Sequence, residues 1–227
     1  MIEILDQIKI KNMYSLEHTV AKPLLDKYEY PWEALGDISD FILEYGKNLS
    51  LDEYDHPSDD VWIHKSAKVF ATAYIGGPCI IGANTEVRQC AFVRGGALVG
   101  ENCVVGNSTE LKNVIIFDNV QVPHYNYVGD SILGYKSHMG AGSITSNVKS
   151  DKTLVHVKSQ DKSVDIDTGR KKFGAMVGDY VEVGCNSVLN PGTVIGKNSN
   201  IYPLSPVRGI VPECSIYKTG GVVVEKE

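Results

Sequence analysis

The sequence lacks the features that mark a membrane, secreted or nucleic-acid-binding protein. No apolar run approaches the roughly 18 residues of a membrane span. The first ten residues, MIEILDQIKI, include Glu3 and Asp6 and do not predict a signal peptide. The formal net charge of −6 gives no basic footprint for nucleic acid or for an anionic membrane surface. The 227 residues, 43% apolar and 22% charged, predict an ordinary globular chain of one or two domains.

Cysteine is scarce, and its pattern excludes zinc-finger spacing. No C-x-x-C pair occurs, and the number of cysteines is odd: Cys79, Cys90, Cys103, Cys185 and Cys214. With no secretion signal, reduced thiols in a cytoplasmic protein are the simplest prediction.

The sequence before residue 61 has a helical pattern. Pro31 can begin a helix whose apolar face carries Trp32, Leu35, Ile38, Phe41, Ile42 and Tyr45. An earlier helix is expected over residues 15–28, weakened by Pro23. The acidic stretch DEYDHPSDD follows and predicts a linker. We therefore expect residues 1–60 to form a helical region and linker, followed by a second unit over 61–227.

In that second unit, large apolar residues recur at every sixth position. The series runs Ile63, Val69, Ile75, Ile81, Val87, Val93, Val99, Val105, Leu111 and Phe117. Its phase slips by one at Val122 and at Leu133, and it resumes from Val177 to Val207. A period of six fits neither a helix nor an alternating strand, and is typical of hexapeptide β-helices. We predict an all-β fold, a left-handed parallel β-helix whose large residues stack in the core.

One segment, at about residues 148–174, interrupts this series. It carries seven basic residues in an acidic chain: Lys149, Lys152, Lys158, Lys162, Arg170, Lys171 and Lys172. Alternating apolar residues over 154–157 and 163–166 predict a hairpin that projects from the coil. Long insertions in solenoids often build sites, and a solvated decoration is the alternative.

Two motifs narrow the function. The stretch VPHYNYVGDSILGYKSHMGAGSITSN contains H-x-x-Y-x-G-D and G-A-G-x-I-T-x-N, and RGGA and VGNSTELK precede it. With these motifs, residues 62–208 resemble the acetyltransferase domain of the bifunctional N-acetylglucosamine-1-phosphate uridylyltransferase/glucosamine-1-phosphate acetyltransferases. The stretch over 167–196 is most similar to the archaeal-type sugar-1-phosphate branch. Residues 1–60 are too short for the uridylyltransferase domain and hold no Gly-rich loop, so nucleotidyl transfer by this chain alone is not expected.

The resemblance implies an acyltransferase of nucleotide-sugar biosynthesis. Its co-substrate would be acetyl-CoA, and its acceptor an amino-sugar 1-phosphate, either glucosamine-1-phosphate or galactosamine-1-phosphate. It also implies a homotrimer with sites between neighbouring solenoids, an arrangement that suits cyclic closure of triangular prisms. No nucleic acid, membrane or metal partner is expected.

Three residues form the implied catalytic group. His124 would be the general base, because an imidazole with an ordinary pKa near 6.5 can accept a proton at neutral pH. Glu110 matches a family carboxylate that would orient the imidazole. Asn147 would contact the sugar.

Four residues are implied to bind the substrate. Arg94 and Lys112 would hold the sugar phosphate, and their separation of 18 residues places them one coil apart on the same face. Tyr127 would contact the sugar. His138 stands where the family commonly has Asn, which leaves the identity of the sugar open.

The coenzyme groove is implied at three further positions. The backbone N–H of Ala141, between Gly140 and Gly142, would face the thioester oxygen, because glycine on both sides lets a ligand approach the backbone. Cys185 replaces a family Ser, and Pro203 replaces a family Ala.

Two other functions compete with this one. A non-catalytic trimeric scaffold or sugar-nucleotide-binding module could descend from the same family. A zinc enzyme of the γ-carbonic anhydrase type needs three converging histidines. His124, His138 and His156 are spaced by 14 and 18 residues, and the last lies in the insertion, which disfavours that reading.

Overall fold

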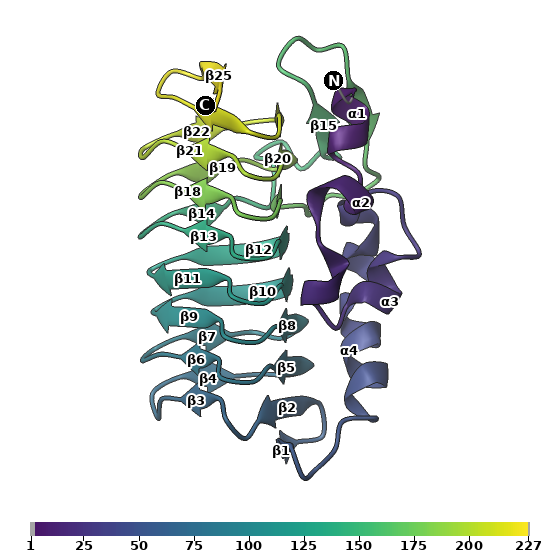
Figure 1. Cartoon of the computed structure of the whole chain (residues 1–227), viewed down its shortest axis with the longest axis vertical. Coiled ribbons are helices and arrows are strands. Elements are labelled where there is room, and N and C mark those ends of the chain that lie inside the picture. The colour runs from purple at the N-terminus through teal and green to yellow at the C-terminus, as the bar shows by residue number, and fades with distance from the viewer. Residues whose placement is uncertain (1–2, 227) are drawn as a thin grey trace.

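Helices from the N-terminal part of the chain lie along one side of a tall stack of short strands (Figure 1). The structure is a computed structural model that describes residues 3–226. The helical elements are α1 (Ile4–Gln7), α2 (Ile10–Met13), the 3-10 turn η1 (Leu16–His18), α3 (Lys22–Leu25), the 3-10 helix η2 (Pro31–Gly36) and α4 (Ile38–Gly46). No helix in the described range has the length and apolar character that a membrane crossing requires.

The helix predicted to begin at Pro31 is confirmed as η2 followed by α4. The earlier prediction of one helix over 15–28 is wrong. That segment forms the separate elements η1 and α3. The physical reason is Pro23. It is tolerated in the first turn of α3, where its missing N–H has no helical partner to lose, but it would break a helix that began earlier in the chain.

The solenoid has three faces, numbered in the order in which the chain visits them. Face 1 holds β2 (Val61–His64), β5 (Cys79–Ile81), β8 (Ala97–Val99), the second halves of β10 (Glu110–Ile116) and β12 (Tyr127–Leu133), β17 (Ala175–Val177), β20 (Thr193–Ile195) and β23 (Ile210–Val211). Face 2 holds β3 (Lys68–Val69), β6 (Glu86–Val87), β9 (Val104–Asn107), β11 (Gln121–His124), β13 (His138–Met139), β18 (Glu182–Val183), β21 (Asn200–Ile201) and β24 (Ser215–Tyr217). Face 3 holds β4 (Tyr74–Ile75), β7 (Phe92–Val93), the first halves of β10 and β12, β14 (Ile144–Thr145), β19 (Val188–Leu189) and β22 (Pro206–Val207).

Within each face the strands pair in parallel, and the residues of the predicted series, except Phe117, stack on their equivalents. Ile81 pairs with Ile63 and Val99 on face 1, and Val87 pairs with Val69 and Val105 on face 2. The fold class is therefore confirmed as a left-handed parallel β-helix of about nine turns. Burying each large side chain of the stack contributes roughly 1.5–3 kcal/mol to stability.

One position of the predicted series is wrong. Ile116, and not Phe117, pairs with Val99, so the first phase slip comes before Val122. The cause lies at the corner between faces 3 and 1. There Asn113 adopts a positive φ of 54° and turns the chain with one residue fewer than the preceding coil uses.

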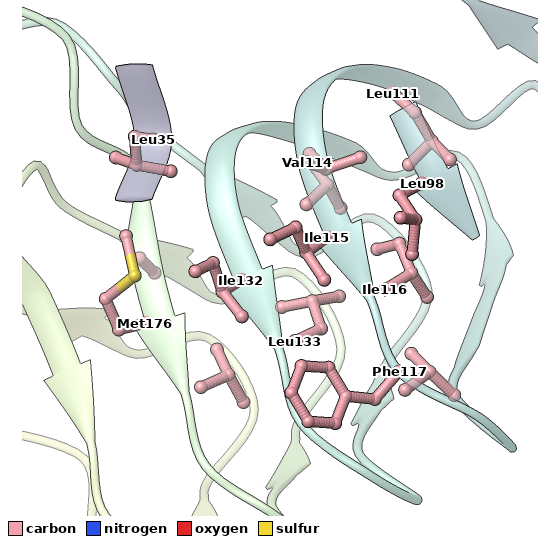
Figure 2. Close-up of a cluster of buried hydrophobic side chains, with 14 of the residues drawn as sticks. Leu35, Leu98, Leu111, Val114, Ile115, Ile116, Phe117, Ile132, Leu133 and Met176 are labelled. Carbon is pink, nitrogen blue, oxygen red and sulfur yellow. The ribbon is translucent and has the colours of Figure 1, made fainter. Parts of the chain in front are cut away.

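The N-terminal helices bury an apolar row on the outside of face 1. The row comprises Trp62, Ile80, Leu98, Ile115, Ile132, Met176 and Val194, all buried. Figure 2 shows Leu35 of η2 next to Ile132 and Met176, where η2 contacts β12. Backbone bonds join the two parts as well: the amide of Asp179 donates to the carbonyl of Met13 at 3.1 Å. The helices are therefore packed on the solenoid and share its core.

The stretch predicted as a linker contains a strand instead. Strand β1 (Tyr54–Ser58) pairs antiparallel with β2. At the other end, β25 (Val223–Glu225) pairs antiparallel with β24. Solenoid ends need such caps, because a terminal strand would otherwise expose unpaired backbone groups.

The insertion forms the predicted hairpin, but the hairpin packs against the coil where it was expected to project from it. Strand β15 (His156–Lys158) pairs antiparallel with β16 (Asp165–Asp167). The hairpin is packed on the rest of the molecule: Val155 and Val157 are buried, and Arg170 donates from Nη2 to the carbonyl of Glu33 at 2.6 Å. The insertion is therefore a structural part of the fold, anchored to the N-terminal helices.

Candidate active site

The corner between faces 2 and 3 aligns four of the predicted residues in consecutive coils. They are His124, Ala141, Cys185 and Pro203, each directly before a residue with positive φ. Hydrogen bonds between coils define the column: Gly142 N donates to His124 O at 2.9 Å, Asn186 N to Ala141 O at 2.8 Å, and Leu204 N to Cys185 O at 2.9 Å. We call these four residues the corner column. Their separations in sequence are 17, 44 and 18 residues, so only the fold shows that they share one corner.

The predicted base stands on a rigid part of that corner. The amide of His124 donates to Oδ1 of Asn126 at 3.0 Å. Buried Asn126 in turn donates from Nδ2 to the carbonyls of Gly140 at 2.8 Å and Ser143 at 3.0 Å. The side chain of His124 is exposed, and its ring makes no hydrogen bond to any residue between 3 and 226. The imidazole is therefore open to a substrate.

Two backbone donors in the corner column, the N–H groups of Ala141 and Cys185, have no acceptor among residues 3–226. The amides of Gly140 and Gly142 are engaged, with the carbonyls of Val183 at 2.7 Å and His124 at 2.9 Å. The N–H of Ala141, between them, has no acceptor in the described part of the chain. Such an unpaired donor beside a candidate base suits the oxygen of a polarised carbonyl.

A polar cluster lies at the end of face 3, where it turns into face 1. Register places Lys112 one coil above Arg94, because Leu111 pairs with Val93. The ammonium of Lys112 lies 3.3 Å from each carboxylate oxygen of Asp130. Nδ2 of Asn147 donates to Asp130 Oδ2 at 2.6 Å and to the Tyr127 hydroxyl at 3.1 Å. The structure thus brings together the four predicted residues Arg94, Lys112, Tyr127 and Asn147.

Asp130 is the residue that the sequence reasoning missed. Its side chain is only 6% exposed, and it accepts hydrogen bonds from Lys112, Asn113 and Asn147. A buried carboxylate needs such partners, since an unpaired one is costly. The signal was present, because Asp130 ends the H-x-x-Y-x-G-D motif.

Burial raises the pKa of Tyr127, and the nearby carboxylates of Asp130 and Glu110 raise it further. The phenol therefore stays protonated at neutral pH and keeps its capacity to donate. Together with the amide of Asn147, it offers neutral hydrogen-bonding groups of the kind that suit sugar hydroxyls.

Glu110 and His138 are placed differently from what was expected. The Glu110 carboxylate pairs with the Arg94 guanidinium at 2.9 Å, and within one chain no contact joins it to His124. His138 lies on face 2, with Nδ1 2.8 Å from Glu182 Oε2, away from the polar cluster on face 3. A single chain therefore does not assemble all ten predicted residues into one pocket.

The three histidines of the zinc alternative lie on different elements. His124 is on β11, His138 on β13 and His156 on β15, and His156 pairs with Asp165 at 2.6 Å. Among residues 3–226, no group of three His, Cys, Asp or Glu side chains is arranged to hold a metal ion.

Comparison with known proteins finds similarity to one domain family and to bifunctional nucleotidylyltransferase/acetyltransferases. The family described as the GMPPB C-terminal domain matches residues 77–165. A bifunctional sugar-1-phosphate nucleotidylyltransferase/acetyltransferase of Sulfurisphaera tokodaii is 31% identical over 217 residues, which are 88% of this chain and 54% of that protein. The bifunctional protein GlmU of Methanococcus maripaludis strain C5 is 33% identical over 201 residues, 87% of this chain and 48% of that protein.

Among solved structures, a hexapeptide transferase family protein from Anaplasma phagocytophilum matches with a TM-score of 0.40. It is 15% identical, and the match covers 74% of this chain and 79% of that one.

These relatives confirm the resemblance to the bifunctional nucleotidylyltransferase/acetyltransferase family, and the hexapeptide solenoid fits the acetyltransferase domain of that family. The chain spans about half the length of the curated relatives that it matches.

Proposed function

We propose that the chain is an acetyl-CoA-dependent N-acetyltransferase that acts on an amino-sugar 1-phosphate, glucosamine-1-phosphate or galactosamine-1-phosphate. The Sulfurisphaera tokodaii relative carries acetyltransferase in its name. The observation that supports the proposal most strongly is the corner column, which sets an open imidazole beside an unpaired backbone donor.

The proposed reaction uses His124 as base and then as acid, and the Ala141 N–H as donor to the carbonyl oxygen. His124 accepts a proton from the sugar amine as the amine nitrogen bonds to the thioester carbonyl carbon. The Ala141 N–H donates to the carbonyl oxygen while that oxygen carries negative charge. When the tetrahedral intermediate collapses, the carbon–sulfur bond breaks, and the proton held by His124 passes to the leaving thiolate. Cys185 and Pro203, in the next two coils, would contact the coenzyme near its thioester, before its arm crosses face 3.

The polar cluster would hold the acceptor. Arg94 and Lys112 lie in adjacent coils, and both carry positive charge that a phosphate can bridge. The Arg94–Glu110 pair is substantially exposed and therefore worth little, so a dianionic phosphate can displace the carboxylate. Tyr127 and Asn147 would bind the sugar ring.

A homotrimer would complete the site. His138 lies on face 2 and the polar cluster on face 3, so the two sets can meet only when face 2 of one copy approaches face 3 of another. The corner and face 3 expose large apolar side chains, among them Tyr74, Phe92, Tyr125 and Leu204, which a second copy would cover. Cyclic closure of three triangular prisms satisfies this requirement.

The test is turnover by the purified full chain. Acetyl-CoA and either amino-sugar 1-phosphate are incubated with the protein, and free thiol release is followed. We expect release that His124→Ala lowers by a factor of roughly 100 to 10,000. Sugar-nucleotide binding without any release would favour the scaffold or binding module instead. The cytoplasmic location remains a prediction.

A further inference from the structure

A basic cleft lies beside the polar cluster, at the same corner of the solenoid but in the coils above it. Two adjoining cavities of about 220 and 280 Å³ share Lys149, Pro191 and Arg208 in their walls. Lys158 and His156 of strand β15 complete the first cavity, and Ser146 lines the second. Ser146 directly precedes Asn147, so the cleft adjoins the polar cluster.

The cleft is built by close backbone packing. A Cβ at Gly192 would lie 2.6 Å from the carbonyl oxygen of His156, and one at Gly209 would lie 2.3 Å from that of Lys158. Both glycines also have positive φ. Only glycine lets β15 run this close to two successive corners. A hydrogen bond also joins the insertion to this corner: Gln160 donates from Nε2 to the carbonyl of Arg208 at 2.8 Å.

The walls are positively charged although the chain is acidic. They carry the cations Lys149, Lys158 and Arg208 and one carboxylate, Asp151, which lies 3.6 Å from the Lys149 ammonium. Asp165 of β16 pairs with Lys158 at 2.9 Å and with His156 at 2.6 Å. The Arg208 side chain is exposed and has no carboxylate partner within residues 3–226. A planar guanidinium flanked by two ammonium groups suits a phosphate or diphosphate.

We infer that this cleft binds the phosphates of the acyl donor, which extends the proposed function and rests on it. Strand register places Lys112, Gly129, Ser146, Asn190 and Arg208 one above another. With coils about 4.8 Å apart, Arg208 lies about 19 Å from Lys112 along the axis. One phosphate cannot contact both, so the cleft serves a second anionic group. Coenzyme A carries its diphosphate and 3′-phosphate far from its thioester, at the end of the pantetheine arm. A sugar nucleotide instead has its diphosphate directly on the sugar.

The experiment measures binding to the full chain by calorimetry, with coenzyme A, pantetheine and a UDP-amino sugar as separate probes. The variants are Arg208→Ala and Lys158→Ala, and the matched controls are Lys162→Ala and Lys171→Ala, basic residues of the same insertion outside the cleft. We expect each cleft variant to weaken coenzyme A binding by roughly tenfold, the loss of a charge-assisted hydrogen bond. Pantetheine binding should stay unchanged, and so should all binding by the controls.

Three outcomes would overturn the inference. Equal affinity of the unaltered protein for coenzyme A and pantetheine would show that no site holds the phosphates. A loss of coenzyme A binding as large in the control variants would assign it to general charge. A loss confined to the UDP-amino sugar would assign the cleft to the acceptor.

Kinetics separate this inference from the proposed function. If the chain turns over, Arg208→Ala should raise the KM for acetyl-CoA and leave the KM for the sugar phosphate unchanged. If the chain does not turn over, the proposed function fails, and the calorimetry still decides whether the cleft binds the phosphates of coenzyme A.

Discussion

Replacing Asp130 by Asn should destabilise the protein and weaken its binding of the acceptor sugar phosphate. The carboxylate receives the Lys112 ammonium at 3.3 Å and the amides of Asn113 and Asn147 at 3.0 and 2.6 Å. An Asn side chain is neutral and has one acceptor oxygen, so it cannot serve all three donors.

The magnitude follows from burial. Removing one partner of a fully buried ion pair costs about 3–5 kcal/mol. The Lys112 side chain keeps 26% exposure while Asp130 keeps 6%, so part of the ammonium charge is still solvated. We therefore expect Asp130→Asn to lower the free energy of unfolding by about 2–3 kcal/mol, measured by urea denaturation.

The control for stability is Glu44→Gln, which breaks an exposed pair with Lys47 and should cost less than about 0.5 kcal/mol. In turnover assays, Asp130→Asn should raise the KM for the sugar phosphate by roughly tenfold, because Lys112 and Asn147 lose their common anchor. The KM for acetyl-CoA should not change. An unfolding free energy equal to that of Glu44→Gln, together with an unaltered KM, would refute the role of Asp130.

Three further predictions test other parts of the structure. Ile115→Ala, under the N-terminal helices, should lower the free energy of unfolding by about 2–5 kcal/mol in urea denaturation, and a loss below about 1 kcal/mol would contradict the packing on face 1. Thiol titration of the native protein at pH 7.5 should label the three exposed cysteines but not Cys79 or Cys103, because burial raises both pKa values, that of Cys103 to about 12; labelling of all five before unfolding would show that the core opens readily. Burial also raises the pKa of Asp179, so the folded state binds more protons than the unfolded state above about pH 4. Stability from this group should therefore fall as pH rises through its folded pKa, and urea denaturation of Asp179→Asn between pH 4 and 7 should lack that component of the slope.

The hexapeptide series determined the solenoid from sequence alone. A large residue repeated at a fixed step, as at Ile63, Ile81 and Val99, can be buried only by stacking on its own equivalents. A second pattern was also readable. Every third residue of the hexapeptide series lies on face 1, and the residue directly before it is also apolar, as Ile80 is before Ile81 and Leu98 before Val99. A strand that is apolar on both sides indicates that this face is covered from outside.

The sequence predicted that the insertion forms a hairpin, but not where the hairpin packs. Alternating residues around Val157 and Val164 predicted a hairpin, since alternation is local to each strand. Its packing against Gly192 and Gly209, which forms the basic cleft, depends on coils that follow later in the chain.

The candidate active site was also predictable only in part from the sequence. The motifs marked His124, Tyr127 and Asn147 as site residues through their resemblance to the family, which a short local stretch of sequence is enough to show. Only the tertiary structure decided that Cys185 stands above Ala141 across the insertion, that Glu110 pairs with Arg94, and that Asp130 joins Lys112 to Asn147. The physical reason is that a corner with one residue fewer, or an insertion between coils, changes which residues stack without changing the repeat itself.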